Sequence, residues 1–159
     1  MDQKQTQWNQ FSFSLDASDG TARAGTIVTP HGVIQTPIFM PVGTRSAIKW
    51  LTTDQIREIG TEIMLVNNYH SYLRPGCDVV ESFGWLHNFM NVELPILTDS
   101  GWFQVFSLGL GMTGENGEKL AKVTEEWVHF RSYLDGSKHF FNPENVMDMQ
   151  HALGADIIM

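Results

Sequence analysis

An aspartate stands directly after a short apolar segment, a position suited to acid–base chemistry. Residues 95–98 (Pro-Ile-Leu-Thr) predict a buried strand, and Asp99-Ser100-Gly101 opens the loop that follows it. Where strands alternate with helices, the active groups gather at the carboxyl ends of the strands. A carboxylate at such an end can transfer a proton to or from a bound substrate. Without further context, an aspartate after a strand is more often a helix cap or a turn former.

Three other residues near predicted strand ends have both a functional and a structural interpretation. Phe103 is an aromatic residue close to the Asp99 loop, and an aromatic residue there is more often ordinary core than a stacking platform. Asn67 either hydrogen-bonds at the active face or serves its own loop. His70 has no partner at metal-ligand spacing, so we assign no metal site.

The first part of the chain predicts a hairpin followed by alternating strands and helices. Residues 11–15 and 22–28 predict two antiparallel strands joined by a turn at Asp19-Gly20. Within residues 33–43, the apolar core between the two prolines predicts a short buried strand. A helix is then expected to begin at Thr52-Thr53-Asp54, with Ile56 and Ile59 on its apolar face and Gly60 as its end.

The alternation continues to the last residue. Residues 62–67 predict a strand, followed by a polar loop and a helix over residues 79–90. After the strand that precedes Asp99, residues 109–119 predict an exposed loop and residues 122–134 an extended arm. Asn142 caps a further helix that ends at Gly154, and the last residues begin a fourth strand.

This order of elements predicts an α/β fold with a parallel sheet and right-handed crossovers, preceded by a small antiparallel hairpin. Four strands cannot close an eight-stranded barrel, so we expect the N-terminal half of a (β/α)₈ TIM barrel. The predicted organisation is a polar N-terminal lead over residues 1–10 and a partial barrel domain over residues 11–159, truncated near the fourth strand.

The composition of the chain excludes several classes of protein. The chain has 159 residues, 42% of them hydrophobic, which suits one globular domain. Its formal charge of −8 has the wrong sign for a protein that holds nucleic acid by charge alone. Cys77 is the single cysteine, which excludes an internal disulfide and a multi-cysteine zinc site. The chain shows neither a signal segment nor a membrane span, so a cytoplasmic location is expected.

Many short segments, in order along the chain, resemble motifs of the tRNA-guanine transglycosylase (queuine tRNA-ribosyltransferase) family. A single match of this kind is weak evidence, but so many in the family's order are highly specific. The matching segments are Asp19-Gly20-Thr21-Ala22-Arg23-Ala24-Gly25, Thr29-Pro30-His31-Gly32, Thr36-Pro37-Ile38-Phe39-Met40-Pro41-Val42-Gly43-Thr44, Asn67-Asn68-Tyr69-His70, Leu73-Arg74-Pro75-Gly76, Ile96-Leu97-Thr98-Asp99-Ser100-Gly101, Phe103-Gln104-Val105-Phe106-Ser107-Leu108, Phe130-Arg131-Ser132 and Leu134-Asp135-Gly136-Ser137.

The resemblance implies a pentosyltransferase of queuosine biosynthesis. Such an enzyme removes guanine from the wobble position of a tRNA anticodon loop and inserts a 7-deazaguanine, which is preQ1 or queuine. By this resemblance Asp99 is the general acid/base, the aromatic ring of Phe103 stacks on the base, and Ser100, Gly101, Trp102 and Phe103 line the substrate pocket. A separate carboxylate must attack the sugar, because displacing a poor leaving base needs both a nucleophile and a proton-transfer group.

The same resemblance implies parts that lie beyond Met159. The family's nucleophilic aspartate, its base-recognising aspartate and a structural zinc site of three cysteines and one histidine all come later in the family pattern. We therefore expect no cofactor in this chain and expect the 159 residues alone to be inactive. Family members commonly work as homodimers, which makes a homodimer the expected full-length form.

Three residues depart from the family pattern. Trp102 stands where a second glycine is usual, and an indole there could crowd the pocket because glycine allows backbone and base to approach closely. Trp50 stands where glycine is common, and Asn68 where threonine is common. The sequence leaves two alternatives open: a truncated or non-catalytic remnant that binds tRNA or a partner, and an unrelated small-molecule barrel enzyme.

Overall fold

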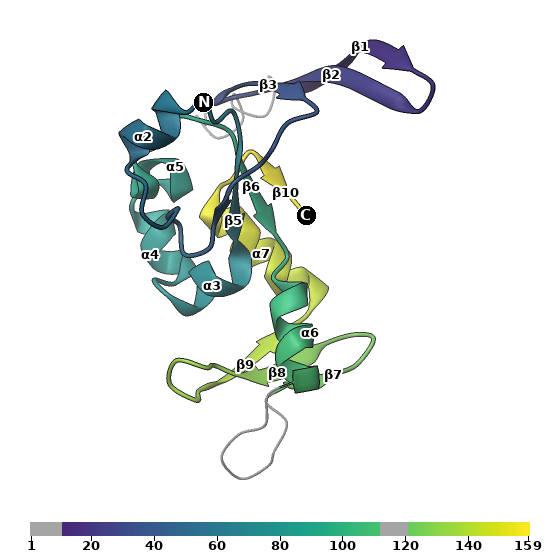
Figure 1. Ribbon diagram of the computed structural model, residues 1–159. Helices are drawn as coiled ribbons and strands as arrows, with labels where there is room; N and C mark the ends of the chain where they lie inside the picture. Colours follow the sequence, from purple (N-terminus) through teal and green to yellow (C-terminus); the bar gives the residue numbers. More distant parts are fainter. Residues whose placement is uncertain (1–10, 112–120) are drawn as a thin grey trace, which may run out of the picture.

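The computed structural model describes residues 11–111 and 121–159, and its centre is a four-stranded parallel sheet. The strands lie in the order β4-β5-β6-β10, so each one pairs with its neighbour in sequence among the parallel strands (Figure 1). Their bounds are Val42–Gly43 for β4, Met64–Asn67 for β5, Ile96–Asp99 for β6 and Ile157–Ile158 for β10.

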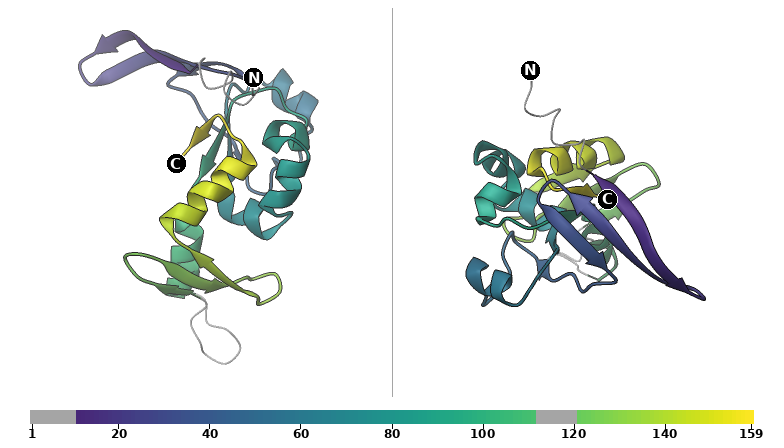
Figure 2. Two further views of the ribbon diagram at one scale, coloured as in Figure 1. Left: turned by 180° about the vertical axis from the view of Figure 1, so that it is seen from behind. Right: turned by 90° about the horizontal axis from the view of Figure 1, so that it is seen from above.

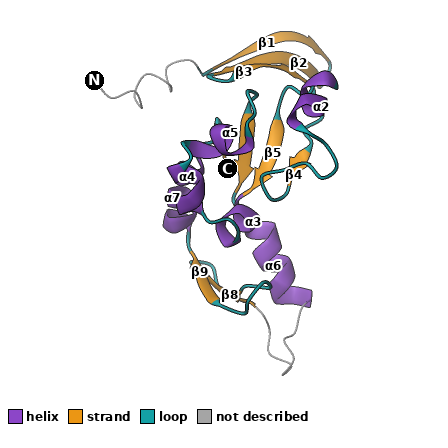
Figure 3. Ribbon diagram, turned by 90° about the vertical axis from the view of Figure 1, so that its left-hand side faces the viewer, coloured by secondary structure: helices purple, strands orange, loops and turns teal. Residues whose placement is uncertain are grey.

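Helices α4, α5 and α7 pack together as one layer on one face of this sheet (Figure 3). Fully buried side chains from the strands and from this layer form the main core, among them Met64, Ile96, Val80, Leu86 and Leu153. The helices within the described residues are α2 (Thr53–Glu58), α3 (Asn68–Leu73), α4 (Cys77–Ser82), α5 (Trp85–Met90), α6 (Trp102–Gly111) and α7 (Pro143–Leu153).

The opposite face of the sheet carries a row of apolar residues that the helix layer does not bury. Val42 pairs with Leu65, Leu65 with Leu97, and Leu97 with Ile157. Residues paired in a parallel ladder point to the same side, and neighbours along a strand point to opposite sides. Val42 is 51% exposed and the other three are half-buried, whereas Met64 and Ile96 on the helix side are fully buried.

Two three-stranded antiparallel sheets lie at opposite ends of the parallel strands (Figures 1 and 2). The first precedes the parallel sheet, and the second connects α6 to α7 and lies beyond the carboxyl ends of the parallel strands. The first comprises β1 (Ser12–Asp19), β2 (Ala22–Thr29) and β3 (Gly32–Thr36), and the second comprises β7 (Ala121–Val123), β8 (Val128–Arg131) and β9 (Lys138–Phe141).

Most of the predicted elements are present, and local interactions explain where they begin and end. The hairpin turns at Asp19-Gly20, the helix expected at Thr52 begins at the capping box of Thr52 and Gln55, and α7 begins at Asn142 and ends at Gly154. Ile59, which we expected on the buried face of its helix, is 65% exposed because it follows the last helical turn as the C-cap.

Three predicted segments were wrong. The apolar core between Pro37 and Pro41 forms no strand, because neither proline has an N–H to donate to a ladder; β3 and β4 lie on either side of it, in different sheets. The helix over residues 79–90 is two helices, interrupted where Gly84 takes a left-handed conformation with φ of 78°. The polar loop expected after residue 67 begins as helix α3, which Asn67 caps.

Part of the predicted organisation lies where the structure gives no description. Of the exposed loop expected over residues 109–119, residues 109–111 belong to α6 and residues 112–119 lie outside the described residues, as does the polar lead over residues 1–10. In the part of the chain that is described, no helix has both the length and the apolar character needed to span a bilayer.

A buried carboxylate ties the first antiparallel sheet to the parallel sheet. Asp156, just before β10, accepts hydrogen bonds from His31 Nδ1 at 2.7 Å, from His87 Nε2 at 3.0 Å and from the Ile96 N–H at 2.9 Å. Burial by itself would raise the pKa of Asp156, but these hydrogen bonds outweigh it and hold the pKa well below its usual value. The β2–β3 turn, helix α5 and strand β6 are thus all hydrogen-bonded to the carboxylate of Asp156.

We expect Asp156→Asn to destabilise the fold by about 2–4 kcal/mol, because an amide cannot accept all three hydrogen bonds. Urea unfolding measures this loss. The control is Asp54→Asn, which removes an exposed carboxylate paired with Arg57 and should change the free energy of unfolding by less than about 0.5 kcal/mol. Equal losses in the two variants would show that the Asp156 cluster contributes nothing special.

The pH dependence of stability has a definite sign. Because the pKa of Asp156 is lower in the folded chain, its carboxylate contributes stability above about pH 4, and this contribution is lost as the pH falls further toward the folded-state value. The wild type should therefore lose more stability than Asp156→Asn between about pH 5 and pH 3. Parallel losses in the two proteins would contradict the assignment.

Candidate functional site

The candidate site is built on two neighbouring strand ends. Asp99 is the last residue of β6 and pairs in register with Asn67, the last residue of β5. Both side chains therefore lie on the sheet face that points away from the helix layer, in the next row beyond Leu65 and Leu97. The Asn67 Nδ2 donates a hydrogen bond of 2.6 Å to Asp99 Oδ2.

Two backbone groups hold the other carboxylate oxygen of Asp99. The N–H groups of Asn68 and Gly101 donate to Asp99 Oδ1 at 3.1 Å and 2.9 Å. The Asn67 Oδ1 accepts from the His70 N–H at 3.1 Å, so this amide is oriented at both ends. Asp99 thus has a fixed orientation. Among the described residues, Oδ2 accepts a hydrogen bond from the Asn67 amide alone, so it keeps lone-pair capacity for a substrate proton.

Gly101 makes this arrangement possible. Its φ is +74°, in the left-handed region that side chains disfavour, and a Cβ there would lie 2.8 Å from Tyr69 Cβ and 2.9 Å from Tyr69 N. Tyr69 itself is buried in the core beneath the second antiparallel sheet, with Val105 and Phe130. The turn after Asp99 therefore packs directly on the first turn of α3.

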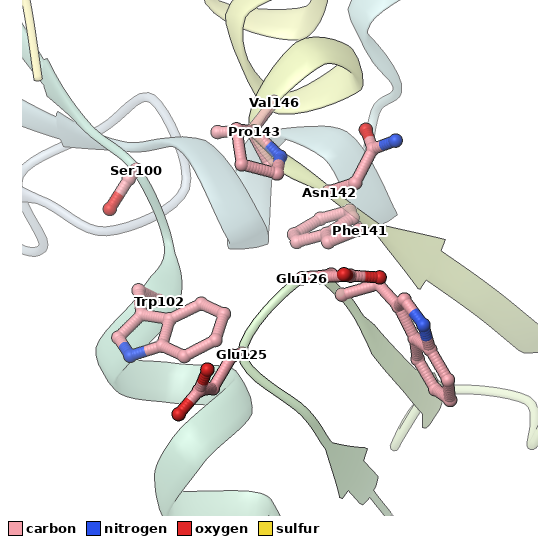
Figure 4. A pocket seen from close by; sticks show the side chains of 9 residues that line it. Ser100, Trp102, Glu125, Glu126, Phe141, Asn142, Pro143 and Val146 are labelled. Atoms are coloured by element: carbon pink, nitrogen blue, oxygen red, sulfur yellow. The ribbon is translucent and has the colours of Figure 1, made fainter.

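A cavity of about 190 Å³ opens beside the Asp99 turn (Figure 4). Of the predicted pocket residues, it brings Ser100 and Trp102 together, while Gly101 bonds Asp99 instead. Phe103 does not line this cavity, and its side chain is 73% exposed. Other lining residues come from distant segments: Glu125, Glu126, Trp127, Phe141 and Pro143.

Comparison with known proteins decides the family. The family model described as queuine tRNA-ribosyltransferase matches residues 18–159. The chain belongs to this family.

The curated relatives agree with the family model. Queuine tRNA-ribosyltransferase of Desulforamulus reducens is 56% identical over 138 residues, which is 87% of this chain and 35% of the relative. The Herpetosiphon aurantiacus protein of the same name is 52% identical over 151 residues, covering 95% of this chain and 36% of the relative. The Aquifex aeolicus protein is 51% identical over 149 residues, covering 94% and 39%. This chain thus spans somewhat more than a third of these relatives.

Asn67 and His70, for which the sequence allowed both a functional and a structural interpretation, have defined partners in the structure. Asn67 does both things that were considered, since its amide nitrogen bonds Asp99 and its oxygen caps α3. The ring of His70 lies 3.3 Å from the Tyr133 hydroxyl, and burial, followed by the charge of Arg45, lowers its pKa. The sequence did not reveal that Glu125 and Trp127 line the cavity. They are more than 20 residues from Asp99, and no local pattern marks them.

The zinc site expected from the family resemblance does not fit the residues of this chain. It requires three cysteines, and Cys77 is the only one. Burial, followed by the charge of Asp78, raises the pKa of the Cys77 thiol to about 11, which keeps it protonated rather than a metal-binding thiolate. A zinc site of this kind must draw its cysteines from elsewhere.

The His31, His87 and Asp156 cluster has metal-ligand chemistry but poor geometry for an ion. Its ligand atoms lie within 4.8 Å of one another. The two imidazole rings, however, are stacked with centroids 3.4 Å apart and planes only 12° from parallel. Nitrogen lone pairs in parallel planes do not converge on one point, so the cluster is better explained by its hydrogen bonds to Asp156.

We expect Gly101→Ala to be more harmful than the same change at a glycine with identical φ. Gly60 also has a φ of +74°, but nothing lies within 4 Å of the position that a Cβ would occupy there. Gly60→Ala should cost about 1–2 kcal/mol from backbone conformation alone. Gly101→Ala adds the clash with Tyr69 and should cost at least about 1 kcal/mol more, as measured by urea unfolding. Equal losses would show that the turn does not pack tightly on Tyr69.

Proposed function

We propose that this chain forms the N-terminal part of the catalytic domain of a tRNA-guanine transglycosylase, in which Asp99 is the general acid/base. The reaction is the exchange of guanine at the tRNA wobble position for a 7-deazaguanine, either preQ1 or queuine. The observation that carries the proposal is the carboxylate of Asp99, oriented by three N–H donors at the carboxyl end of β6. The name of the relatives, queuine tRNA-ribosyltransferase, supports the same substrate.

The geometry suits proton transfer to or from a nucleobase. The orienting bonds from Asn67, Asn68 and Gly101 fix the carboxylate before substrate binds, so little reorganisation accompanies the reaction. Phe103, one helical position beyond Trp102, presents a largely exposed ring that is available to stack on a base. Base-modifying enzymes of this kind hold an extruded nucleotide in a pocket.

We further propose that the parallel sheet is half of a (β/α)₈ barrel. The sequential strand order and the helix layer on one face support this, because barrel strands are added one after another with helices outside. The partly exposed row of Val42, Leu65, Leu97 and Ile157 has the apolar character of a barrel interior. The complete protein would act on tRNA in the cytoplasm, as a homodimer, with zinc bound outside these residues.

A second candidate is a chain that binds tRNA or a partner protein but does not catalyse. The four parallel strands end at Gly43, Asn67, Asp99 and Ile158, and only one of these residues is an acid. Base exchange through a covalent sugar intermediate needs a nucleophilic carboxylate in addition to the proton-transfer group. We therefore expect the isolated 159 residues to show no exchange of guanine into tRNA.

A chimaera separates the two candidates. In it, this chain replaces the matching 138-residue segment of the Desulforamulus reducens relative. We expect incorporation of labelled guanine into tRNA by the chimaera, and a loss of at least about 100-fold in kcat with Asp99→Asn, since general acid–base catalysis contributes roughly 10²–10⁴-fold.

The control for folding is Asp54→Asn in the same chimaera, at an exposed carboxylate that pairs with Arg57 on helix α2, and it should leave exchange unchanged. A folded chimaera without exchange would favour the binding-only candidate. Exchange that survives Asp99→Asn would contradict the role given to this aspartate.

A further inference from the structure

Gln150 is a polar residue on the buried face of helix α7. Its side chain is fully buried, and it lies on the same side of the helix as the core residue Leu153, three positions further along. Helix residues that face a sheet are usually apolar, since a buried amide without hydrogen bonds costs stability. The hydrogen bonds of the Gln150 amide must therefore offset the cost of burying it.

The Gln150 amide uses its complete hydrogen-bonding capacity. Its Oε1 accepts hydrogen bonds from the Thr98 hydroxyl and from the Met159 N–H, both at 3.1 Å. Its Nε2 donates to the Met159 carbonyl oxygen at 2.7 Å and to the Met147 sulfur at 3.8 Å. A side-chain amide has two acceptor positions and two N–H donors, so all four are occupied. Because the N–H and the carbonyl of Met159 need opposite partners, they fix the orientation of the amide.

The two hydrogen bonds to Met159 hold the backbone where it leaves β10. Ile158, the last residue of β10, pairs with Thr98, so the next residues along the two strands are Met159 and Asp99. Within the described residues, β10 has only β6 as a strand neighbour. The Gln150 amide offers Met159 the donor and the acceptor that a second neighbouring strand would offer. It therefore joins α7 to both strands at the level of Asp99.

The place of Met159 relative to Asp99 matters for a reaction at this end of the sheet. In parallel α/β folds, the residues that follow the strands form the site at the carboxyl ends. In a longer protein that contains this chain, the segment after Met159 therefore emerges beside Asp99. A displacement of about 1 Å in a reacting site can lower the rate about 100-fold.

We propose that Gln150 is a positioning residue for the reaction at Asp99. Its amide fixes the point where the chain leaves β10, and through Met159 it places the segment that follows beside Asp99. The proposal rests on the proposed function, because it takes Asp99 as the group that handles the base. Gln150 itself touches no substrate, since it is enclosed between α7 and the sheet. A purely structural role would affect stability alone, so the kinetics of the folded enzyme separate the two roles.

The first test is steady-state guanine exchange by the chimaera that carries this chain, with activity expressed per folded enzyme. Gln150→Met keeps the length of the side chain but removes its amide. We expect kcat to fall at least about tenfold, because the strand end is no longer held, while the KM for tRNA changes less than about twofold.

The control for this test is Leu86→Ala, which removes buried packing from α5 beside His87, at the amino ends of the strands. It should lower stability but leave kcat and KM of the folded enzyme unchanged. An unchanged kcat in Gln150→Met, or an equal fall in both variants, would overturn the proposal.

A carboxyl side chain at position 150 gives a pH signature. The protonated carboxyl of Gln150→Glu can accept from the Met159 N–H and donate to the Met159 carbonyl, as the amide does. The ionised form cannot donate, and burial raises the pKa of such a carboxyl group. We therefore expect the kcat of Gln150→Glu, divided by that of the parent chimaera, to rise at least about fivefold from about pH 8 to about pH 6. This ratio cancels the titration of Asp99, which both enzymes share.

The matching ratio for Gln150→Met should stay flat over the same pH range, because methionine does not titrate. A flat ratio for Gln150→Glu would contradict the positioning role. This comparison holds even if Gln150→Met fails to fold, since Gln150→Glu is then compared with the parent alone.

Hydrogen exchange tests the contact at Met159 without any measurement of activity. The Met159 N–H donates to Gln150, so the peptide that contains it should exchange at least about tenfold faster in the Gln150→Glu chimaera at about pH 8 than in the parent. Peptides from α5 should exchange equally fast in both. An unchanged Met159 peptide would refute the proposal, whereas dependence of guanine exchange on Asp99 in the parent chimaera decides the proposed function separately.

Discussion

The in-register pairing of β5 with β6 is the constraint on which the candidate site depends. It places Asn67 beside Asp99 and turns both side chains to the sheet face opposite the helices. Side chains alternate along a strand, so a slip of one residue would send Asp99 into the helix layer, where Thr98 now bonds Gln150. Such a slip of β6 would also expose Ile96, and the burial of this residue therefore protects the geometry of the site.

The two ends of the parallel sheet hold carboxylates in different environments. At the amino ends of the strands, the charge of Asp156 is fully enclosed and bonded to two histidines and a backbone N–H, which suits a structural function. At the carboxyl ends, Asp99 is only half-buried and stands next to an open cavity. Parallel α/β architectures typically carry their reactive groups at the carboxyl ends of the strands, which agrees with the role proposed for Asp99.

The elements that could be predicted from the sequence are those that short-range residue patterns determine. The strand before Asp99, the Asn142 cap and the stop at Gly154 all follow from residues within one or two turns of each other. The helix over residues 79–90 was mispredicted because its apolar spacing continues through Gly84, whose backbone turns left-handed. The strand expected between Pro37 and Pro41 was mispredicted because the two prolines interrupt hydrogen bonding there, and the chain passes from one sheet to another at this point.

The candidate site was predictable only in part. Asp99 and Ser100 come from one motif, so their proximity is given by the sequence. The donors that orient Asp99 include a side chain 32 residues away, and the cavity joins α6 to residues of β9 and of the β7–β8 connection. These contacts depend on how separate elements pack, which no local pattern reveals. The indole of Trp102, which could crowd the base pocket, forms one wall of this cavity.

The most direct test of the central constraint is a double-mutant cycle on Asn67 and Asp99, with the free energy of urea unfolding as the measured quantity. Asn67→Ala, Asp99→Ala and the double variant are compared with the wild type. The structure predicts a coupling energy of about 1–2 kcal/mol, because the 2.6 Å hydrogen bond joins an amide to a half-buried carboxylate. A coupling within about 0.3 kcal/mol of zero would mean that the two strand ends are not joined as described, and the site built on them would have to be abandoned.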